Sequence, residues 1–227
     1  MLINDSLIDA AANRGVTVNT GFTLNPPPTP SDLKKFETND DPNWILYHLP
    51  YNKTSQGQPL SHWNLFFTRA GPVNPRLHDM WCMLHNSKAR ITNVMLPVLA
   101  DAYLRQADNF TPNSDFSYAA CVARAERAID GDVRQDDLDK AVMRYWTATQ
   151  SLSLEIVRQL PEEGVQWVLL RAEAKAIRDG RLVVEVTLLD EEMRLLAYGK
   201  AVDLLIPAQR WVQESLRDGR GAKIMKI

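Results

Sequence analysis

The chain has 227 residues, of which 45% are hydrophobic, enough apolar material for one sizeable domain with a buried core. The formal net charge is only −2, and Lys and Arg are scattered among Asp and Glu. This balance excludes a general binder of nucleic acid, which would carry a basic patch or stripe.

Cysteine usage and the apolar runs indicate an intracellular protein. The two cysteines, Cys82 and Cys121, are too few for a disulfide framework, so we expect free thiols in a reducing compartment. The first residues lack the basic start of a secretory signal. The longest apolar runs fall far short of the roughly 18 residues that a membrane span requires. We therefore expect a cytoplasmic or peroxisomal protein without a membrane span.

The N-terminal segment, residues 1–31, contains Pro26-Pro27-Pro28 and Pro30. Such a composition favours extended backbone and resists helix or central strand. We interpret the segment as a linker, and a disordered N-terminal tail is the alternative.

Two strands are predicted next. Residues 44–49 form a compact apolar and aromatic run that ends before Pro50. In residues 62–68 the apolar side chains Trp63, Leu65 and Phe67 alternate with polar ones, the period of a half-buried strand. The composition of residues 52–57 indicates a turn between them.

The middle of the chain has helical spacing. A helix is predicted from Ser87, its candidate cap, to about Arg105, because apolar residues recur at three- and four-residue intervals. These residues are Ile91, Val94, Met95, Val98 and Ala102. Pro97 lies within this stripe and predicts a kink or two separate pieces. Residues 117–146 are predicted to be helical again, interrupted at 130–132.

The last third of the chain predicts an antiparallel meander. Residues 151–156, 168–176 and 182–188 each alternate between apolar and other side chains. Asp179-Gly180 has the composition of a two-residue hairpin turn, and a further strand runs from Leu195 to about Ile206. Ala172, Ala174 and Ala176 would leave a groove for a helix. The sequence thus predicts an α+β fold in which an antiparallel sheet wraps around a central helix.

Several short stretches, in order, resemble one protein family. They are Asp40–Trp44, Ile91-Thr92-Asn93, Ala100-Asp101, Leu160–Trp167, Asp179-Gly180-Arg181 and Leu189–Glu192. The set is similar to the C-terminal hotdog of acyl-CoA thioesterase-like proteins common in fungi, which are relatives of the type II acyl-CoA thioesterases. The resemblance covers roughly residues 15–210 and implies a hotdog fold with an acyl-CoA as substrate or ligand.

The resemblance also implies a domain organisation. Similar proteins are double hotdogs, with a complete first hotdog before a Pro-rich linker. We expect residues 1–31 to be the linker or remnant of that absent half, because the chain starts almost at the linker. The hotdog would occupy residues 32–207, with a helical insertion at about 117–146, and 208–227 would form a tail. An open sheet edge then predicts a homodimer or a separate hotdog partner.

Thioester hydrolysis requires a carboxylate, a side chain that orients water, and donors for the oxyanion. In similar thioesterases an Asp on the hotdog helix, a Thr on the next strand and a Gln on the last strand share the first two tasks. Asp101 and Thr149 match the first two as catalytic candidates. The alternatives are an exposed helix carboxylate and an ordinary strand threonine.

The sequence departs from the family pattern at two places. Ser151-Leu152 replaces its Asp-His, and Ala201 stands where the glutamine is expected. An alanine cannot orient water, and loss of such a group commonly costs about 10²–10³ in rate.

Other chemistry is not indicated. The histidines have no metal-ligand spacing with Cys82 or the acids, and no phosphate-binding glycine motif is present. His85 follows Cys82 at a helical separation of three, which does not distinguish a nucleophile–base pair from a chance pair. We expect neither metal nor cofactor.

Three functions remain open. The first is a hydrolase of fatty-acyl or related acyl-CoA thioesters. The second is a catalytically degenerate hotdog that binds acyl groups or another protein, and the third is a hotdog enzyme of specialised metabolism.

Overall fold

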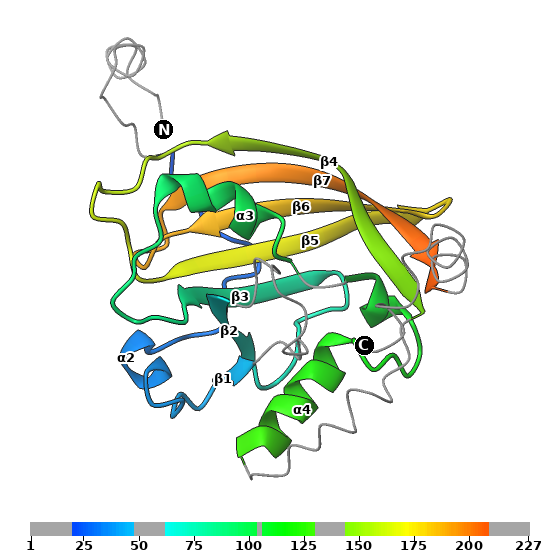
Figure 1. The fold of residues 1–227 in the computed structure, drawn as a ribbon, viewed down its shortest axis with the longest axis horizontal. Helices are drawn as coiled ribbons and strands as arrows, with labels where there is room; N and C mark the ends of the chain where they lie inside the picture. Colours follow the sequence, from blue (N-terminus) through cyan, green and yellow to red (C-terminus); the bar gives the residue numbers. More distant parts are fainter. Residues whose placement is uncertain (1–19, 48–61, 104–105, 130–143, 209–227) are drawn as a thin grey trace, which may run out of the picture.

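A computed structural model describes residues 20–47, 62–103, 106–129 and 144–208, and the structural statements below concern these ranges. They form one seven-stranded sheet, in which every neighbouring pair is antiparallel, in the order β1-β2-β3-β5-β6-β7-β4 (Figure 1). The strands are β1 (Trp44–Tyr47), β2 (Trp63–Thr68), β3 (Leu77–Leu84), β4 (Tyr145–Ile156), β5 (Val168–Arg178), β6 (Arg181–Leu189) and β7 (Leu195–Pro207). The helices are α2 (Leu33–Phe36), α3 (Leu96–Ala100), α4 (Tyr118–Ile129) and the 3₁₀ turns η2 (Asn93–Met95) and η3 (Gln106–Phe110).

The predicted C-terminal meander is confirmed. Strands β5 and β6 form a hairpin at Asp179 and Gly180, whose φ angles of 52° and 72° lie in the left-handed region that this turn requires. Strand β7 continues the meander, and β4 pairs along the outer side of β7. The 12-residue strand β4 is therefore one edge of the sheet.

One face of the sheet is covered by α3, η3 and α4, and the main hydrophobic core lies between them (Figure 1). Helix α3 contacts β6, and the small side chains of Ala172 and Ala174 are buried in this core. Ala176 follows a register shift in β5 and is exposed. The sheet thus packs against a helix on its alanine-bearing face, as predicted.

The opposite face carries a second, aromatic core at the β1–β2–β3–β5 end. Its buried residues are Phe36, Trp44, Phe66, Trp81, Met83, Trp167, Leu169 and Leu189. Leu24 and Leu33 pack against them. The carbonyl oxygen of Pro30 accepts a hydrogen bond from Trp44 Nε1 at 3.0 Å. Residues 24–30 therefore lie against the sheet, and residues 1–19 of the predicted linker lie outside the described ranges.

A buried ion pair links this second face to the N-terminal segment. Arg171 on β5 donates from Nε and Nη2 to the two carboxylate oxygens of Asp79 on β3, at 2.7 and 2.6 Å. Its Nη1 donates to the carbonyl oxygen of Pro26 at 2.6 Å. One guanidinium thus joins two strands to the segment that crosses them.

The prediction of a long helix over residues 87–105 is wrong. Ile91 exchanges backbone hydrogen bonds with Val165 at 2.7 and 3.0 Å, so the chain is still extended there. Pro97 lies in the first turn of α3, where a missing backbone donor costs nothing. The predicted apolar stripe is wrong in part: Ile91 and Ala102 are buried, but Val94 is 81% exposed, and the buried positions of α3 are Leu96, Leu99 and Ala100.

Two further elements differ from expectation. Helix α4 ends at Ile129, residues 130–143 lie outside the described ranges, and β4 already begins at Tyr145, so the predicted helix over 117–146 is wrong at its end. Strand β3 was not predicted. Seven of its eight residues are buried, because both faces of the sheet are covered at that point, and such a strand does not alternate in polarity.

Strand β4 contains an irregularity that matters for the site. Thr149 pairs with Asp203 of β7, and the next pair is Ser151 with Val202, so Gln150 is an extra residue, a β-bulge. Beyond the bulge Leu152 pairs with Ala201. Because of the extra residue, Thr149 and Leu152 face the same side although three positions separate them.

In the described ranges, no helix is both long and apolar enough to cross a membrane. The predicted strand end at residues 48–49, the turn at 52–57 and the tail from residue 209 lie outside those ranges.

Candidate active site

The two residues predicted as catalytic lie together. Asp101 caps the C-terminal end of α3, where its backbone N–H bonds to the carbonyl oxygen of Pro97 at 3.3 Å. Thr149 lies on β4, and its hydroxyl donates to Asp101 Oδ1 at 2.8 Å. Both residues are exposed. The fold thus brings a carboxylate and a hydroxyl, 48 residues apart in sequence, into an accessible hydrogen-bonded pair.

Two further polar side chains adjoin this pair and were missed by the sequence analysis. Asp203 lies on β7 directly opposite Thr149 and is 1% exposed. The hydroxyl of Tyr103, which follows α3, lies 2.8 Å from each carboxylate oxygen of Asp203. A signal existed for Asp203: it follows Ala201 by two, and an acidic residue on the buried face of a strand is unusual. No comparable pattern singled out Tyr103.

Burial dominates the electrostatics of this second pair. It raises the pKa of Asp203 above its ordinary value, and the nearby charge of Asp101 acts in the same direction. Hydrogen bonds with Tyr103 and Thr149 oppose that shift. The pKa of Tyr103 is raised above its usual range by burial and by the charge of Asp203, so its hydroxyl keeps its proton and remains a donor.

Ala201, where the glutamine was expected, is fully buried in the main core. It pairs with Leu152 on one side and Val184 on the other. The position therefore supplies packing and no side-chain hydrogen bond.

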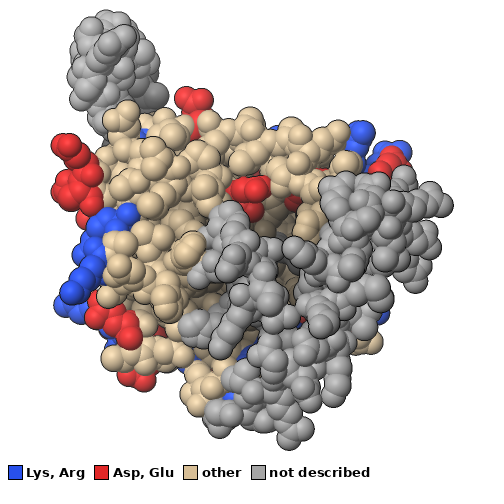
Figure 2. All heavy atoms as spheres, in the orientation of Figure 1, with Lys and Arg blue, Asp and Glu red and all other residues tan. Residues whose placement is uncertain are grey.

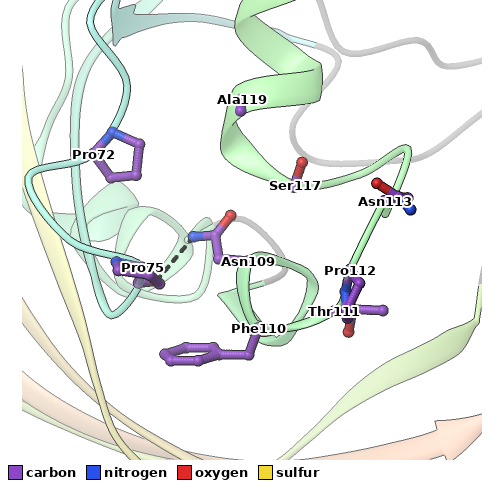
Figure 3. Close-up of a pocket in the computed structure, with 9 residues that line it drawn as sticks. All are labelled: Pro72, Pro75, Asn109, Phe110, Thr111, Pro112, Asn113, Ser117 and Ala119. Carbon is purple, nitrogen blue, oxygen red and sulfur yellow. Dashed lines mark hydrogen bonds between the residues drawn. The ribbon is translucent and has the colours of Figure 1, made fainter.

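A separate open recess of about 430 Å³ lies between the loop after β2 and the segment from η3 to α4 (Figure 3). Its lining residues are Pro72, Pro75, Asn109, Phe110, Thr111, Pro112, Asn113, Ser117 and Ala119. None of these side chains titrates. The recess therefore offers no acid or base of its own.

Cys82, His85 and His78 are the other groups considered for chemistry, and their surroundings are as follows. Cys82 lies on β3 and not on a helix, and its burial raises the pKa of the thiol, which keeps it from acting as a nucleophile. His85 is exposed and bonds to Asn64. His78 is buried, which lowers its pKa to about 3, and its Nε2 contacts Asn109. Burial holds His78 neutral in an apolar setting.

The thiols of Cys82 and Cys121 are both buried. Within the described ranges no three His, Cys, Asp or Glu residues are grouped as metal ligands. On the face shown in Figure 2, charged side chains are scattered, mostly around the rim of the described surface, and form no basic stripe.

The fold and this site define a class: an α+β hotdog, in which an antiparallel sheet packs against a helix whose end carries a carboxylate. The model of the family described as acyl-CoA thioesterase C-terminal domain matches residues 29–200, and the chain belongs to that family. It is thus an acyl-CoA thioesterase-like protein with a hotdog fold.

One relative is similar to the chain in sequence, and two solved structures are similar to it in fold. The chain is 28% identical over 203 residues to the thioesterase-like protein TwmA of Talaromyces wortmannii, a match that covers 86% of the chain and 57% of the relative. A structure of a candidate thioesterase from Novosphingobium aromaticivorans is 16% identical with a TM-score of 0.52, covering 86% of this chain and 58% of that one. A protein with a hotdog fold from Alicyclobacillus acidocaldarius is 11% identical with a TM-score of 0.51, covering 85% and 58%. The chain therefore spans little more than half the length of these relatives.

Proposed function

We propose that this chain hydrolyses acyl-CoA thioesters, with Asp101 as the carboxylate that activates water and Thr149 as the side chain that orients it. The observation that carries the proposal is the 2.8 Å hydrogen bond from Thr149 to Asp101 on the exposed end of α3. The acyl-CoA class comes from the family, and a fatty-acyl or related thioester is the proposed substrate.

The geometry supports the following chemistry. Thr149 donates its one hydroxyl proton to Oδ1 of Asp101, which leaves Oδ2 free to accept a proton from water. As the water oxygen bonds to the thioester carbon, its proton passes to Asp101. The carbon–sulfur bond then breaks, and the proton is returned to the leaving thiolate. The products are a carboxylic acid and free CoA, and the carboxylate is regenerated.

The test is release of free CoA from acyl-CoAs of increasing chain length. Its thiol can be followed with a thiol-reactive chromophore, since both cysteines of the protein are buried and give little background. We expect Asp101→Asn to lower kcat by about 10²–10⁴, the usual contribution of a positioned general base. Thr149→Val should lower kcat by less, because it removes orientation and not the base.

Asp179→Asn is the matched control. Asp179 is an exposed carboxylate at the β5–β6 turn, and Asn tolerates its positive φ. Its turnover should equal that of the unaltered protein. Turnover that survives in Asp101→Asn would refute the assignment.

One observation favours a second function, an acyl-binding module without turnover. Ala201 is fully buried, so the third hydrogen-bonding partner of similar thioesterases has no replacement at that position. This alternative predicts saturable binding of acyl-CoA without release of CoA. Turnover that depends on Asp101 would exclude it.

We also propose that β4 pairs with another hotdog, either a second copy of this chain or a separate domain. Among the described strands β4 has a neighbour only on its β7 side, and such an edge is a template for pairing. Ile156 and Val157 at its end are 41% and 58% exposed.

Light scattering tests the association. We expect a dimer that becomes monomeric when Ile156 and Val157 are both replaced by Lys. The control is Val73→Lys, a 65% exposed apolar residue between β2 and β3, and the strands β5, β6 and β7 lie between β3 and β4. A well-behaved monomer for the unaltered chain would contradict the homodimer.

A further inference from the structure

Helix α3 is too short to hold its own end in place. It has five residues, and the exposed Asp101 follows as its C-cap. A helix of this length is marginal in water, so tertiary contacts must fix it. Leu96, Leu99 and Ala100 are buried in the main core, and α3 contacts β6. Such apolar contacts are non-directional, so they hold the helix on the sheet without fixing where Asp101 points.

Tyr103 supplies a directional contact two residues after Asp101. Its hydroxyl lies 2.8 Å from each carboxylate oxygen of Asp203 on β7 and donates to them. The two side chains are 9% and 1% exposed. A hydrogen bond in such a buried place is stronger than one in water. This bond, the Tyr103–Asp203 tether, joins the chain just after α3 to the sheet.

The position of Asp203 on its strand closes a circuit of contacts around the site. Asp203 is the cross-strand partner of Thr149 in the β4–β7 ladder. The Thr149 hydroxyl donates to Asp101 Oδ1 at 2.8 Å. The contacts that leave Asp101 through Thr149 therefore return to it through Asp203 and Tyr103. Opening the circuit at Tyr103 would free the end of α3 to move relative to β4.

We propose that Tyr103 and Asp203 are positioning residues of this site: their hydrogen bond ties the end of α3 to β7 and so keeps the Asp101 carboxylate in reach of Thr149. The inference rests on the proposed hydrolysis at Asp101. A reacting group displaced by about 1 Å can lose about 10² in rate. The loss should appear in kcat and not in KM, because the tether acts on the base and not on acyl-CoA binding.

The first test measures the tether without turnover. The backbone N–H of Asp101 bonds to the Pro97 carbonyl oxygen at 3.3 Å, and that of Ala102 bonds to the Leu99 carbonyl oxygen at 2.9 Å. Tyr103→Phe keeps the ring and removes the hydroxyl. Hydrogen exchange followed by NMR should show these two amides exchanging about tenfold faster relative to the amides of β6, the effect of losing one typical hydrogen bond.

Tyr118→Phe is the matched control for that experiment. Tyr118 is a buried tyrosine of α4, and its hydroxyl contacts the backbone nitrogen and the hydroxyl of Thr68 on β2 at 2.6 and 3.0 Å. Strands β3, β5 and β6 lie between β2 and β7. Tyr118→Phe should leave the exchange of the two amides relative to β6 unchanged. If Tyr103→Phe changes it no more than this control does, the inference is overturned whether or not the protein is an enzyme.

The second test measures turnover of acyl-CoA at a temperature where the variants are folded. Tyr103→Phe should lower kcat by about 10- to 10²-fold with little change in KM, and Tyr118→Phe should leave kcat unchanged. Asp203→Asn keeps an oxygen that can accept from Tyr103, so it should retain most of kcat. Asp203→Leu removes the acceptor and should behave as Tyr103→Phe does. Equal losses in the two Asp203 variants would count as a merely structural role and overturn the inference.

A double variant adds a readout that general destabilisation would not produce. The tether and the Thr149 hydroxyl act on the same carboxylate, so their effects should not be additive. Tyr103→Phe should therefore cost less in kcat when Thr149→Val is already present than it does alone. Losses that multiply would mean that Tyr103 acts independently of the Asp101–Thr149 pair, which contradicts the proposal.

The two proposals fail in different ways. Absent turnover in the unaltered protein, or turnover independent of Asp101, defeats the hydrolase, and the exchange measurement then decides the tether alone. Turnover that needs Asp101 but is unchanged in Tyr103→Phe defeats only the positioning role.

Discussion

Replacing Arg171 by Met should strongly destabilise the fold. The guanidinium and the Asp79 carboxylate are 6% and 7% exposed and share two hydrogen bonds of 2.7 and 2.6 Å. Removing one partner of a buried ion pair typically costs about 3–5 kcal/mol, because the other charge stays buried and unpaired. The lost hydrogen bond to the Pro26 carbonyl oxygen adds about 1 kcal/mol.

Such a loss is a large part of the 5–15 kcal/mol that holds a typical domain together. Urea denaturation followed by tryptophan fluorescence measures it, since Trp81 and Trp167 lie in the aromatic core on this face of the sheet. Arg178→Met is the control. Arg178 is 87% exposed, so that change should stay within about 0.5 kcal/mol.

A double variant distinguishes the loss of the ion pair from a general disruption of packing around it. Replacing Asp79 by Leu and Arg171 by Met together removes both charges, and such exchanges are often neutral or stabilising. We expect the double variant to be more stable than Arg171→Met alone. If Arg171→Met costs no more than Arg178→Met, the buried pair does not contribute as argued.

Three other changes have defined outcomes. Gly164→Ala should destabilise the fold by more than Gly71→Ala in urea denaturation: both have positive φ, but a Cβ at Gly164 would lie 2.6 Å from the Ile91 carbonyl oxygen, whereas the space at Gly71 is open. Burial raises the pKa of Asp203, so its contribution to stability is complete below the unfolded pKa of about 3.9 and is lost as pH rises through the folded pKa. Thermal unfolding across that pH range should therefore show Asp203→Asn gaining stability relative to the unaltered protein. Stability curves that run parallel with pH would contradict this. Cys82 and Cys121 should react with a thiol reagent only after unfolding, and rapid labelling of the native protein would show that they are accessible.

Every strand except β3 was predicted, most of them from alternating apolar and polar side chains and β1 from a compact apolar run. In β6 and β7 apolar and polar side chains alternate, and Asp179-Gly180 marks the turn before β6. Strand β3 has side chains buried on both faces, so its sequence carries no alternation. Helix α3 is too short for a stripe to develop, and the spacing that suggested a longer helix came from Ile91, which is in an extended segment.

The site was predicted in part. Asp101 and Thr149 were identified by their similarity to a family pattern, and the structure places them 2.8 Å apart. Their catalytic roles remain a prediction. Asp203 could have been found by continuing the alternation of β7 two residues beyond Ala201. Tyr103 could not, because its position depends on how the chain leaves α3.

The extra residue in β4 has a consequence for how this strand can change. Leu152 must face inwards to pack and Thr149 must face inwards to reach Asp101, two demands that a regular strand cannot satisfy at an odd spacing. Many substitutions of Gln150 would preserve the bulge, and deleting Gln150 would leave Thr149 and Leu152 two positions apart, a spacing at which a regular strand also holds both on one side. The pairing of hydroxyl and carboxylate would instead be lost in a regular strand that kept Gln150, because either Thr149 or Leu152 would then turn towards solvent.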